Sequence, residues 1–206
     1  MDETVITVRD LTVELGGTRI LHGFDLDVRA GEWVSIMGAN GAGKSTLLRC
    51  LAGLQRPAAG EVTVFGRPPV DEPAFWRDVV HVADEPAWYP WLSVREHIDL
   101  MRAVHDEARL DTDTALELFE LTGRDDVAPP RLSTGQRQRL ALAMGLVRPS
   151  RMLLLDEPER GLDLDFRDRL KEIFVAYAVA GGTLVMATHD DDLAWATRRL
   201  TLDAAG

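Results

Sequence analysis

The chain has 206 residues, of which 46% are hydrophobic and 28% are charged, enough for the core of one globular domain with or without an inserted subdomain. Its formal net charge of −11 argues against a nucleic-acid-binding protein and against adsorption to anionic lipid. No apolar run approaches the roughly 18 residues of a membrane helix, and the acidic start does not resemble a secretory signal. Because Cys50 is the only cysteine, an intrachain disulfide and a cysteine-based zinc site are excluded. We therefore expect a cytosolic protein.

The first thirty residues have the alternating pattern of half-buried strands. The pattern covers Thr4–Val8, Leu11–Leu15 and Phe24–Val28, with a turn at Gly16-Gly17. A continuous apolar strand, Trp33–Met37, follows them. We therefore predict a small antiparallel sheet that packs against the core of the domain.

The later strands are mostly apolar without alternation. The pattern predicts strands at Val62–Phe65 and Val79–Val82, and further on at Met152–Leu155 and Thr183–Ala187. Continuous apolar runs are typical of parallel strands that are covered on both faces. A helix between the last two strands has one apolar face, formed by Phe166, Leu170, Ile173, Phe174 and Tyr177. The fold class is therefore predicted to be α/β with a mostly parallel sheet.

The middle of the chain has a helical pattern. Val94, Ile98 and Met101 share one helix face, and Pro129-Pro130 interrupts the pattern further on. Because core strands resume afterwards, we predict a helical subdomain at about residues 86–147, inserted into a single domain that spans residues 1–206.

A glycine-rich loop at residues 38–45 carries the clearest chemical signal. It fits the pattern G-x-x-x-x-G-K-[ST], and a buried strand precedes it while the predicted helix Thr46–Ala52 follows, ending at Gly53. Such glycines let backbone N–H groups converge on phosphates at the start of a helix. Lys44 is predicted to contact the β- and γ-phosphates, and Ser45 to bind Mg²⁺. The predicted phosphate-binding residues are Gly38, Asn40, Gly41, Ala42, Gly43, Lys44, Ser45 and Thr46.

Two carboxylates follow the strand Met152–Leu155. In a sheet that also carries the glycine-rich loop, a carboxylate at the C-terminal end of a strand can reach the same Mg²⁺. Asp156 is therefore predicted to bind the metal directly or through water. Glu157 is predicted to orient or deprotonate a water near the γ-phosphate.

A second anion site is predicted at the segment Leu132-Ser133-Thr134-Gly135-Gln136. Ser133 is expected to cap the helix that follows, and the Ser- and Gly-rich start of that helix can bind an anion. A single nucleotide in a single core does not need a second phosphate site.

These motifs occur in the order found in ATP-binding cassette (ABC) ATPases, and the chain resembles the nucleotide-binding subunit of an ABC transporter over nearly its whole length. The resemblance rests on the glycine-rich loop, Leu-Ser-Thr-Gly-Gln, Leu-Leu-Leu-Asp-Glu-Pro and Thr188-His189-Asp190. It implies that two subunits hold two molecules of ATP with Mg²⁺ between them, as a homodimer or a heterodimer. It also implies roles for three further segments. Ser133, Gly135 and Gln136 would contact ATP held by the other subunit. The loop that ends at Asp163 would cross the dimer interface, and His189 would contact the γ-phosphate.

The chain departs from the family pattern at three places. Asp84, or Glu85 if the register shifts by one, stands where the family usually has a Gln that senses Mg²⁺ and the membrane subunit. An ionised carboxylate can still bind Mg²⁺ but cannot donate a hydrogen bond. Leu15 replaces the aromatic residue that stacks on adenine in many members, which predicts weaker or less base-selective nucleotide binding. Glu159-Arg160 occupy positions where small or hydroxyl residues are usual.

An aromatic cluster, Trp88, Tyr89 and Trp91, follows Asp84. In the family this region receives a short helix of the membrane subunit, and aromatic residues are enriched at interface hot spots. We therefore interpret residues 84–91 as a candidate docking surface; packing of the cluster inside the helical subdomain is an equally good interpretation. Trp33, Trp76 and Trp195 are interpreted as core residues.

The resemblance favours an ATP-hydrolysing subunit that powers an ABC transporter through separate membrane subunits, at the cytoplasmic face of the membrane. A soluble ABC ATPase of a cytosolic assembly complex is the second hypothesis. A nucleotide-binding regulator that does not hydrolyse ATP is the third, motivated by Asp84, although the presence of Glu157 and His189 argues against it.

Overall fold

The computed structural model describes residues 3–105, 108–188 and 197–202. The strands in this part of the chain are β1 (Thr4–Leu15), β2 (Thr18–Arg29), β3 (Trp33–Met37), β4 (Ala59–Val64), β5 (Val79–Val82), β6 (Met152–Asp156), β7 (Thr183–Ala187) and β8 (Arg198–Thr201). The helices are α1 (Lys44–Leu51), α2 (Pro73–Asp78), α3 (Val94–Ala103), α4 (Thr112–Leu118), the short 3₁₀ helix η1 (Pro129–Arg131), α5 (Thr134–Leu146) and α6 (Leu164–Val179).

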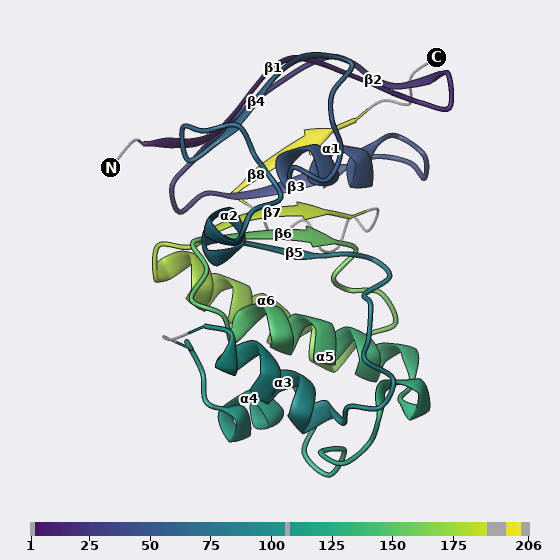
Figure 1. Cartoon of the computed structure of the whole chain (residues 1–206), viewed down its shortest axis with the longest axis vertical. Helices are drawn as coiled ribbons and strands as arrows, with labels where there is room; N and C mark the ends of the chain where they lie inside the picture. Colours follow the sequence, from purple (N-terminus) through teal and green to yellow (C-terminus); the bar gives the residue numbers. More distant parts are fainter. Residues whose placement is uncertain (1–2, 106–107, 189–196, 203–206) are drawn as a thin grey trace.

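The molecule is built in layers around a parallel sheet with the strand order β5-β6-β7-β3-β8. An antiparallel sheet with the order β2-β1-β4 lies on one side of it, with α1 between the two sheets, and α3 to α6 lie on the other side (Figure 1). This arrangement confirms the predicted α/β fold class with its additional antiparallel sheet.

Two apolar cores lie on the two faces of the parallel sheet, and single strands contribute to both. Met152 and Leu154 of β6 face the core shared with α1 and the antiparallel sheet, while Leu153 and Leu155 face the core shared with the helices. Successive side chains of a strand point to opposite faces. A strand covered on both faces therefore has to be apolar at every position, as the continuous run predicted.

The first predicted strands are wrong in their boundaries. The structure joins Thr4–Val8 and Leu11–Leu15 into the single strand β1, and β2 begins at Thr18 rather than at Phe24. Asp10, with φ of 48°, lies between the two predicted segments, and the register with β2 shifts there. A β-bulge keeps the chain extended while it interrupts the alternating pattern, which explains why the pattern suggested a break.

Two elements have no signal in the sequence pattern. The edge strand β8 is partly exposed and pairs with β3 in parallel, and the Leu202 N–H that follows it donates to the Met37 carbonyl at 2.8 Å. The short helix α2 contains no fully buried residue. The interpretation of Trp76 as a core residue is accordingly wrong in part, because the side chain is only partly buried and its indole donates to Asp71 at 2.6 Å.

The helices between β5 and β6 bury most of the residues that the pattern placed on shared faces, and Met101 is partly buried. Val94 and Ile98 of α3 are fully buried, and Ser93 caps this helix with a capping box. Phe119 and Leu121, just beyond α4, are fully buried as well.

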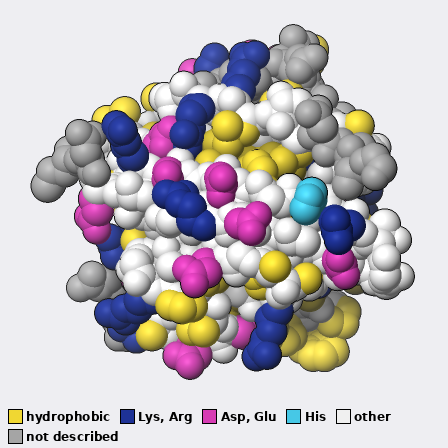
Figure 2. Space-filling view, turned by 90° about the horizontal axis from the view of Figure 1, so that it is seen from above, with side chains coloured by type: hydrophobic (Ala, Val, Ile, Leu, Met, Phe, Trp, Pro, Cys, Tyr) yellow, Lys and Arg dark blue, Asp and Glu magenta, His cyan; other side chains and the backbone are white. Residues whose placement is uncertain are grey.

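None of the described helices is both long enough and apolar enough to span a bilayer. Seen from the side of the antiparallel sheet, the surface shows acidic and basic side chains interspersed (Figure 2).

Candidate functional site

The glycine-rich loop connects β3 to α1 in a conformation that depends on glycine. Gly41 and Gly43 have φ of 82° and 95°, values that favour glycine over residues with a side chain. A Cβ on Gly38 would lie 2.6 Å from the Leu202 carbonyl oxygen, so the segment after β8 closes tightly on the loop. The predicted strand, loop and helix therefore occur together, and the helix α1 begins directly at Lys44.

Lys44 is held inside the loop. Its side chain is buried, and Nζ donates to the carbonyl oxygens of Gly38 at 2.7 Å and of Ala39 at 3.1 Å. A buried ammonium group needs acceptors for its protons. The loop carbonyls supply them here, and phosphate oxygens are the stronger, charged acceptors that such a site can take instead.

A polar hollow of about 530 Å³ opens in front of this loop. Its lining brings together predicted residues from three segments: the glycine-rich loop, Asp84 after β5 and Glu157 after β6. The full lining is Ile20, Asn40, Gly41, Gly43, Lys44, Ser45, Thr46, Asp84, Glu157 and Arg160. Ile20 and Arg160 were not predicted as site residues; Ile20 lies in β2, and its methyl group would contact a Cβ on Gly43 at 3.1 Å.

Asp156 ends β6 beside Ser45. The residue is only 5% exposed, and its Oδ1 is buried with no hydrogen-bond partner among the described residues. Burial raises the pKa of the Asp156 carboxyl, the Ser45 hydroxyl opposes this, and the nearby Glu157 and Asp84 raise the pKa further. A divalent cation between Ser45 and Asp156 would remove the cost of burying this carboxylate, so the two residues fit the predicted Mg²⁺ site.

Glu157 follows in an unusual backbone conformation. Its φ is 46°, and its N–H donates to the Ala187 carbonyl at 2.9 Å, which ties the loop after β6 to the neighbouring strand β7. Residues other than glycine that adopt such positive φ values cluster at functional sites, where the surrounding structure holds them. The conformation places the Glu157 carboxylate on the wall of the polar hollow.

The helix α5 presents the second predicted anion site. Ser133 and Gln136 form a capping box, in which the Ser133 hydroxyl accepts from the Gln136 N–H at 3.2 Å and the Gln136 side chain accepts from the Ser133 N–H at 3.0 Å. Ser133 is exposed. Among the described residues, no member of this motif lines the polar hollow, so the two predicted phosphate-binding elements do not line one hollow.

The start of α5 also holds the loop that follows β6. A Cβ on Gly135 would lie 2.4 Å from the Gly161 carbonyl oxygen, and the Gln138 side chain donates to the Pro158 carbonyl at 3.1 Å. Glycine at position 135 is therefore required by close packing against the loop.

Asp163 is engaged within its own chain. It caps α6 by accepting from the Phe166 N–H at 2.9 Å, and its other oxygen pairs with Arg139 at 2.7 Å. Arg139 is mostly buried, pairs also with Glu120 at 2.6 Å and stacks 4.0 Å from the centre of the Phe166 ring. The predicted contact of Asp163 across a dimer interface stays a prediction. No sequence motif predicts these contacts of Arg139, because its partners are distant along the chain.

The side chains of the neighbouring residues Glu159 and Arg160 have different surroundings. Glu159 is buried, and its carboxylate accepts a hydrogen bond from the Thr188 hydroxyl. Arg160 faces the polar hollow and forms an ion pair with Asp84. The residue that stands in place of the family's Gln is thus paired with an arginine of the loop after β6. Its predicted binding to Mg²⁺ stays a prediction.

A second, less polar groove of about 410 Å³ lies on the other side of the segment after β5. It is lined by Val80, His81, Val82, Ala83, Glu85, Pro86, Ala87, Trp88, Met101, Ala141, Met144, Gly145 and Arg148. Burial, with a smaller effect of the positive charge of Arg49, lowers the pKa of His81 to about 4. His81 therefore stays neutral near pH 7 in this groove.

The three aromatic residues after Asp84 differ in exposure. Trp88 is partly buried against the helical core and contacts His97 edge to face, whereas Trp91 is 76% exposed and Tyr89 is 50% exposed. Trp88 therefore matches the interpretation as a packing residue, while Tyr89 and Trp91 are available at the surface.

The remaining predicted residues have separate outcomes. His189 and Trp195 lie outside the described residues. Leu15 ends β1 and is 41% exposed, and it is not part of the lining of the polar hollow.

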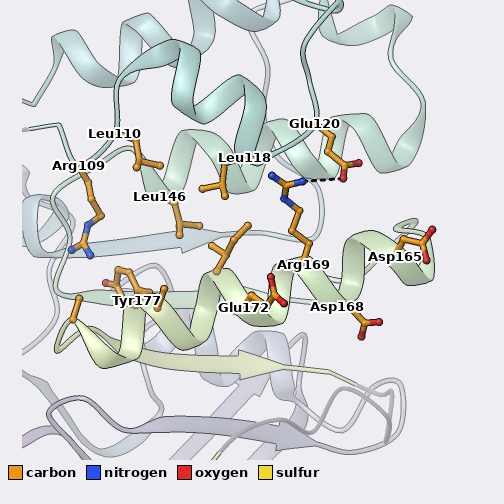
Figure 3. Close-up of a pocket in the computed structure, with 13 residues that line it drawn as sticks. Arg109, Leu110, Leu118, Glu120, Leu146, Asp165, Asp168, Arg169, Glu172 and Tyr177 are labelled. Atoms are coloured by element: carbon orange, nitrogen blue, oxygen red, sulfur yellow. Dashed lines mark hydrogen bonds and ion pairs between the residues drawn. The ribbon is translucent and has the colours of Figure 1, made fainter.

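A larger hollow, of about 790 Å³, lies elsewhere in the described part of the chain (Figure 3). Leu110, Leu118 and Leu146 point into it from one side, and Tyr177 and Arg169 line it along α6 (Figure 3). Since its lining contains no residue of the glycine-rich loop, this hollow is separate from the predicted phosphate site.

Comparison with protein families matches residues 21–160 to the family model described as ABC transporter. The spermidine/putrescine import ATP-binding protein of Spiroplasma citri is 33% identical over 197 residues, which cover 93% of this chain and 56% of that protein. The corresponding protein of Acidothermus cellulolyticus is 39% identical over 199 residues, with 92% and 52% covered. The chain thus spans about half the length of these curated relatives.

Solved structures of ATP-binding cassettes are also similar to this chain. A dimeric ATP-binding cassette in a post-hydrolysis state, bound to ADP and Pi, superposes with a TM-score of 0.86 at 25% identity and covers 98% of this chain and 97% of that chain. A dimeric bacterial ABC transporter cassette has a TM-score of 0.83 at 27% identity, with 96% and 94% covered.

Proposed function

The chain belongs to the ABC transporter family, and from this premise we propose that it is an ATP-binding and ATP-hydrolysing subunit that powers transport through separate membrane subunits. ATP is proposed to bind in the polar hollow, with its phosphates on the glycine-rich loop and Lys44. Ser45 and Asp156 would hold Mg²⁺, which neutralises phosphate charge during phosphoryl transfer. Glu157 would accept the proton of the attacking water.

A dimer is part of the proposal because each chain carries two phosphate-binding elements that do not meet in one hollow. The polar hollow contains the glycine-rich loop but no residue of the Ser133–Gln136 motif. In a head-to-tail dimer, the Ser133–Gln136 motif of one copy would complete the site of the other. The dimeric cassettes with similar folds support dimerisation. This division of the two elements is the single observation that carries the proposal.

The groove beside β5 is proposed as the contact with the membrane subunit. Tyr89 and Trp91, which follow the groove-lining Trp88 in the chain, are large exposed aromatic side chains, and such residues commonly dominate binding at interfaces. The groove is suited to a short helix that inserts an apolar side chain between Trp88 and Met144. The complex would keep the chain at the cytoplasmic face of the membrane.

The cargo is not part of the proposal. The curated relatives are named for the import of chemically different compounds, which include spermidine and putrescine, sn-glycerol-3-phosphate and aliphatic sulfonates. Since their ATP-binding subunits are all similar to this chain, selectivity is expected in the membrane subunits.

Two measurements test the proposal. The Glu157→Gln variant is expected to form a dimer by light scattering when ATP and Mg²⁺ are added, and to stay monomeric with ADP. Lys44→Ala is the matched control and should not dimerise with either nucleotide. A tagged chain should also copurify a polytopic membrane protein in stoichiometric amount from detergent-solubilised membranes. A stable soluble partner in its place would favour the assembly ATPase.

A further inference from the structure

The ion pair between Asp84 and Arg160 connects two loops that are 76 residues apart in the sequence. Asp84 follows β5 and Arg160 follows β6, and these two strands are neighbours in the parallel sheet. Both side chains line the polar hollow together with Lys44 and Ser45. The pair therefore lies at the proposed nucleotide site and not on a remote surface.

The backbone of Arg160 is held firmly in place. Its N–H donates to the Glu157 carbonyl at 3.0 Å, and the preceding Glu159 is anchored by the Thr188 hydroxyl. On the other side, a Cβ on Gly135 would clash with the Gly161 carbonyl, so the loop packs directly on α5. The position of the Arg160 side chain is consequently set by the same loop that positions Glu157.

The guanidinium of Arg160 has capacity beyond the ion pair. An arginine carries five N–H donors in a planar fork, and among the described residues the acceptor of this side chain is Asp84, bonded to Nη1. The side chain is 48% exposed toward the hollow. The remaining donors can therefore bind an anionic group in the hollow while Asp84 keeps the guanidinium oriented.

The charges around the hollow indicate where such an anion would lie. Asp84, Glu157 and Lys44 all lie close enough to Asp156 to shift the pKa of its carboxyl, and Asp84 and Glu157 line the hollow. Asp84, Glu157 and Glu85 all raise the pKa of Arg160, so this arginine is the cation at the carboxylate-rich end. Glu157 is proposed to act at the terminal phosphate, which puts that phosphate at the same end.

We propose that Arg160 contacts the γ-phosphate of the ATP held by its own subunit, and that Asp84 is the positioning residue that orients Arg160 for this contact. The inference rests on the proposed binding of ATP in the polar hollow. The inference explains why both unusual residues are present. The carboxylate of Asp84 alone would repel a phosphate. Paired with Arg160, it instead orients a cation that can bind the phosphate. An arginine that stabilises the charge of a transferring phosphate is a known device of other nucleotide hydrolases.

The test compares the binding of two nucleotides to the isolated chain by calorimetry, in the presence of Mg²⁺. A non-hydrolysable ATP analogue carries the γ-phosphate and ADP does not. For Arg160→Ser, we expect the affinity for the analogue to fall about tenfold, the effect of losing one charge-assisted contact, and the affinity for ADP to change by less than about twofold. Arg160→Lys keeps the charge but not the fork, and should lose less for the analogue.

The control and the second variant separate this role from a general effect on charge or folding. Arg95→Ser removes an arginine from a comparable exposed ion pair, with Asp113, and should change neither affinity. In a background of Asp84→Gln, the loss caused by Arg160→Ser should shrink to about threefold, because Arg160 is no longer oriented. Thermal unfolding of each variant checks that the fold is kept.

Three results would overturn the inference. Equal losses for the analogue and for ADP would show that Arg160 does not contact the γ-phosphate. The same loss with and without Asp84 would remove the positioning role. A higher Mg²⁺ requirement of Asp84→Gln would make Asp84 a metal ligand instead. If the parent chain binds neither nucleotide, the proposed function itself fails, and that result is distinct from the other three.

Discussion

The polar hollow and the groove beside β5 lie on the two sides of one short segment, and they are built from opposite chemistry. The hollow is lined by Lys44, Asp84, Glu157 and Arg160, whereas the groove is lined mainly by aliphatic and aromatic side chains such as Val80, Trp88 and Met144. Asp84 faces the hollow while Glu85 and Trp88 line the groove. A movement of this segment would therefore change the lining of the hollow and of the groove together.

Because of this difference, a substitution can affect either nucleotide hydrolysis or partner binding alone, although one backbone segment connects the two proposed sites. In the proposed function, charged groups in the hollow would bind and hydrolyse the nucleotide, and apolar groups in the groove would bind a partner. Each can be removed without touching the other, because they share only the backbone between them. Variants that affect one side alone test this division.

The largest effect is expected from Glu157→Gln in the hollow. The amide cannot accept a proton, so turnover of ATP should fall by at least about 100-fold, while the binding of ATP and of the membrane partner is kept. Single-turnover hydrolysis and calorimetry measure the two quantities. Glu117→Gln removes an exposed carboxylate of α4 and serves as the control. Turnover at the rate of the parent chain would exclude Glu157 as the base.

A smaller effect is expected from Trp91→Ser, in the segment that follows the groove-lining Trp88. Loss of a large exposed aromatic contact should weaken binding to the membrane subunit about tenfold, and basal ATP hydrolysis by the isolated chain should not change. Binding to the copurified membrane protein is measured in detergent by surface plasmon resonance. Val179→Ser, at another exposed hydrophobic residue, is the control and should leave this binding intact. If both substitutions have the same small effect, the partner does not bind at Trp91.

The smallest effect concerns stability and comes from His81 in the groove. Its pKa is lowered to about 4 from the ordinary value of 6.5, so the unfolded chain takes up this proton at a higher pH than the folded chain. The contribution of the neutral imidazole is complete above about pH 6.5 and is lost as the pH falls toward 4, by an amount on the order of 3 kcal/mol.

Urea unfolding of the parent and of His81→Gln between pH 7 and pH 4 measures this contribution. The free energy of unfolding of the variant should fall less steeply over that range. His22→Gln, at an exposed histidine of β2, is the control. Parallel curves for the parent and for His81→Gln would contradict the lowered pKa.

Much of this site could be predicted from the sequence because its motifs are local. The glycine-rich loop needs only glycine at positions with positive φ, a lysine and a following helix, all within a few residues. The same holds for Ser133 and Gln136, which cap one helix through their own backbone, and for Asp156 at the end of one apolar strand. Each of these arrangements is determined by neighbours in the chain.

Other features were decided only by the tertiary structure. The bulge at Asp10 joined two predicted strands into β1, and the edge strand β8 has no hydrophobic pattern because none of its positions is fully buried and two of its four residues are arginines. The sequence marked Asp84 and Arg160 as unusual residues, but not as partners. They meet because β5 and β6 lie side by side in the sheet, which depends on the order of strands. Side chains that are far apart in the chain interact through the packing of whole elements, and no local pattern records that packing.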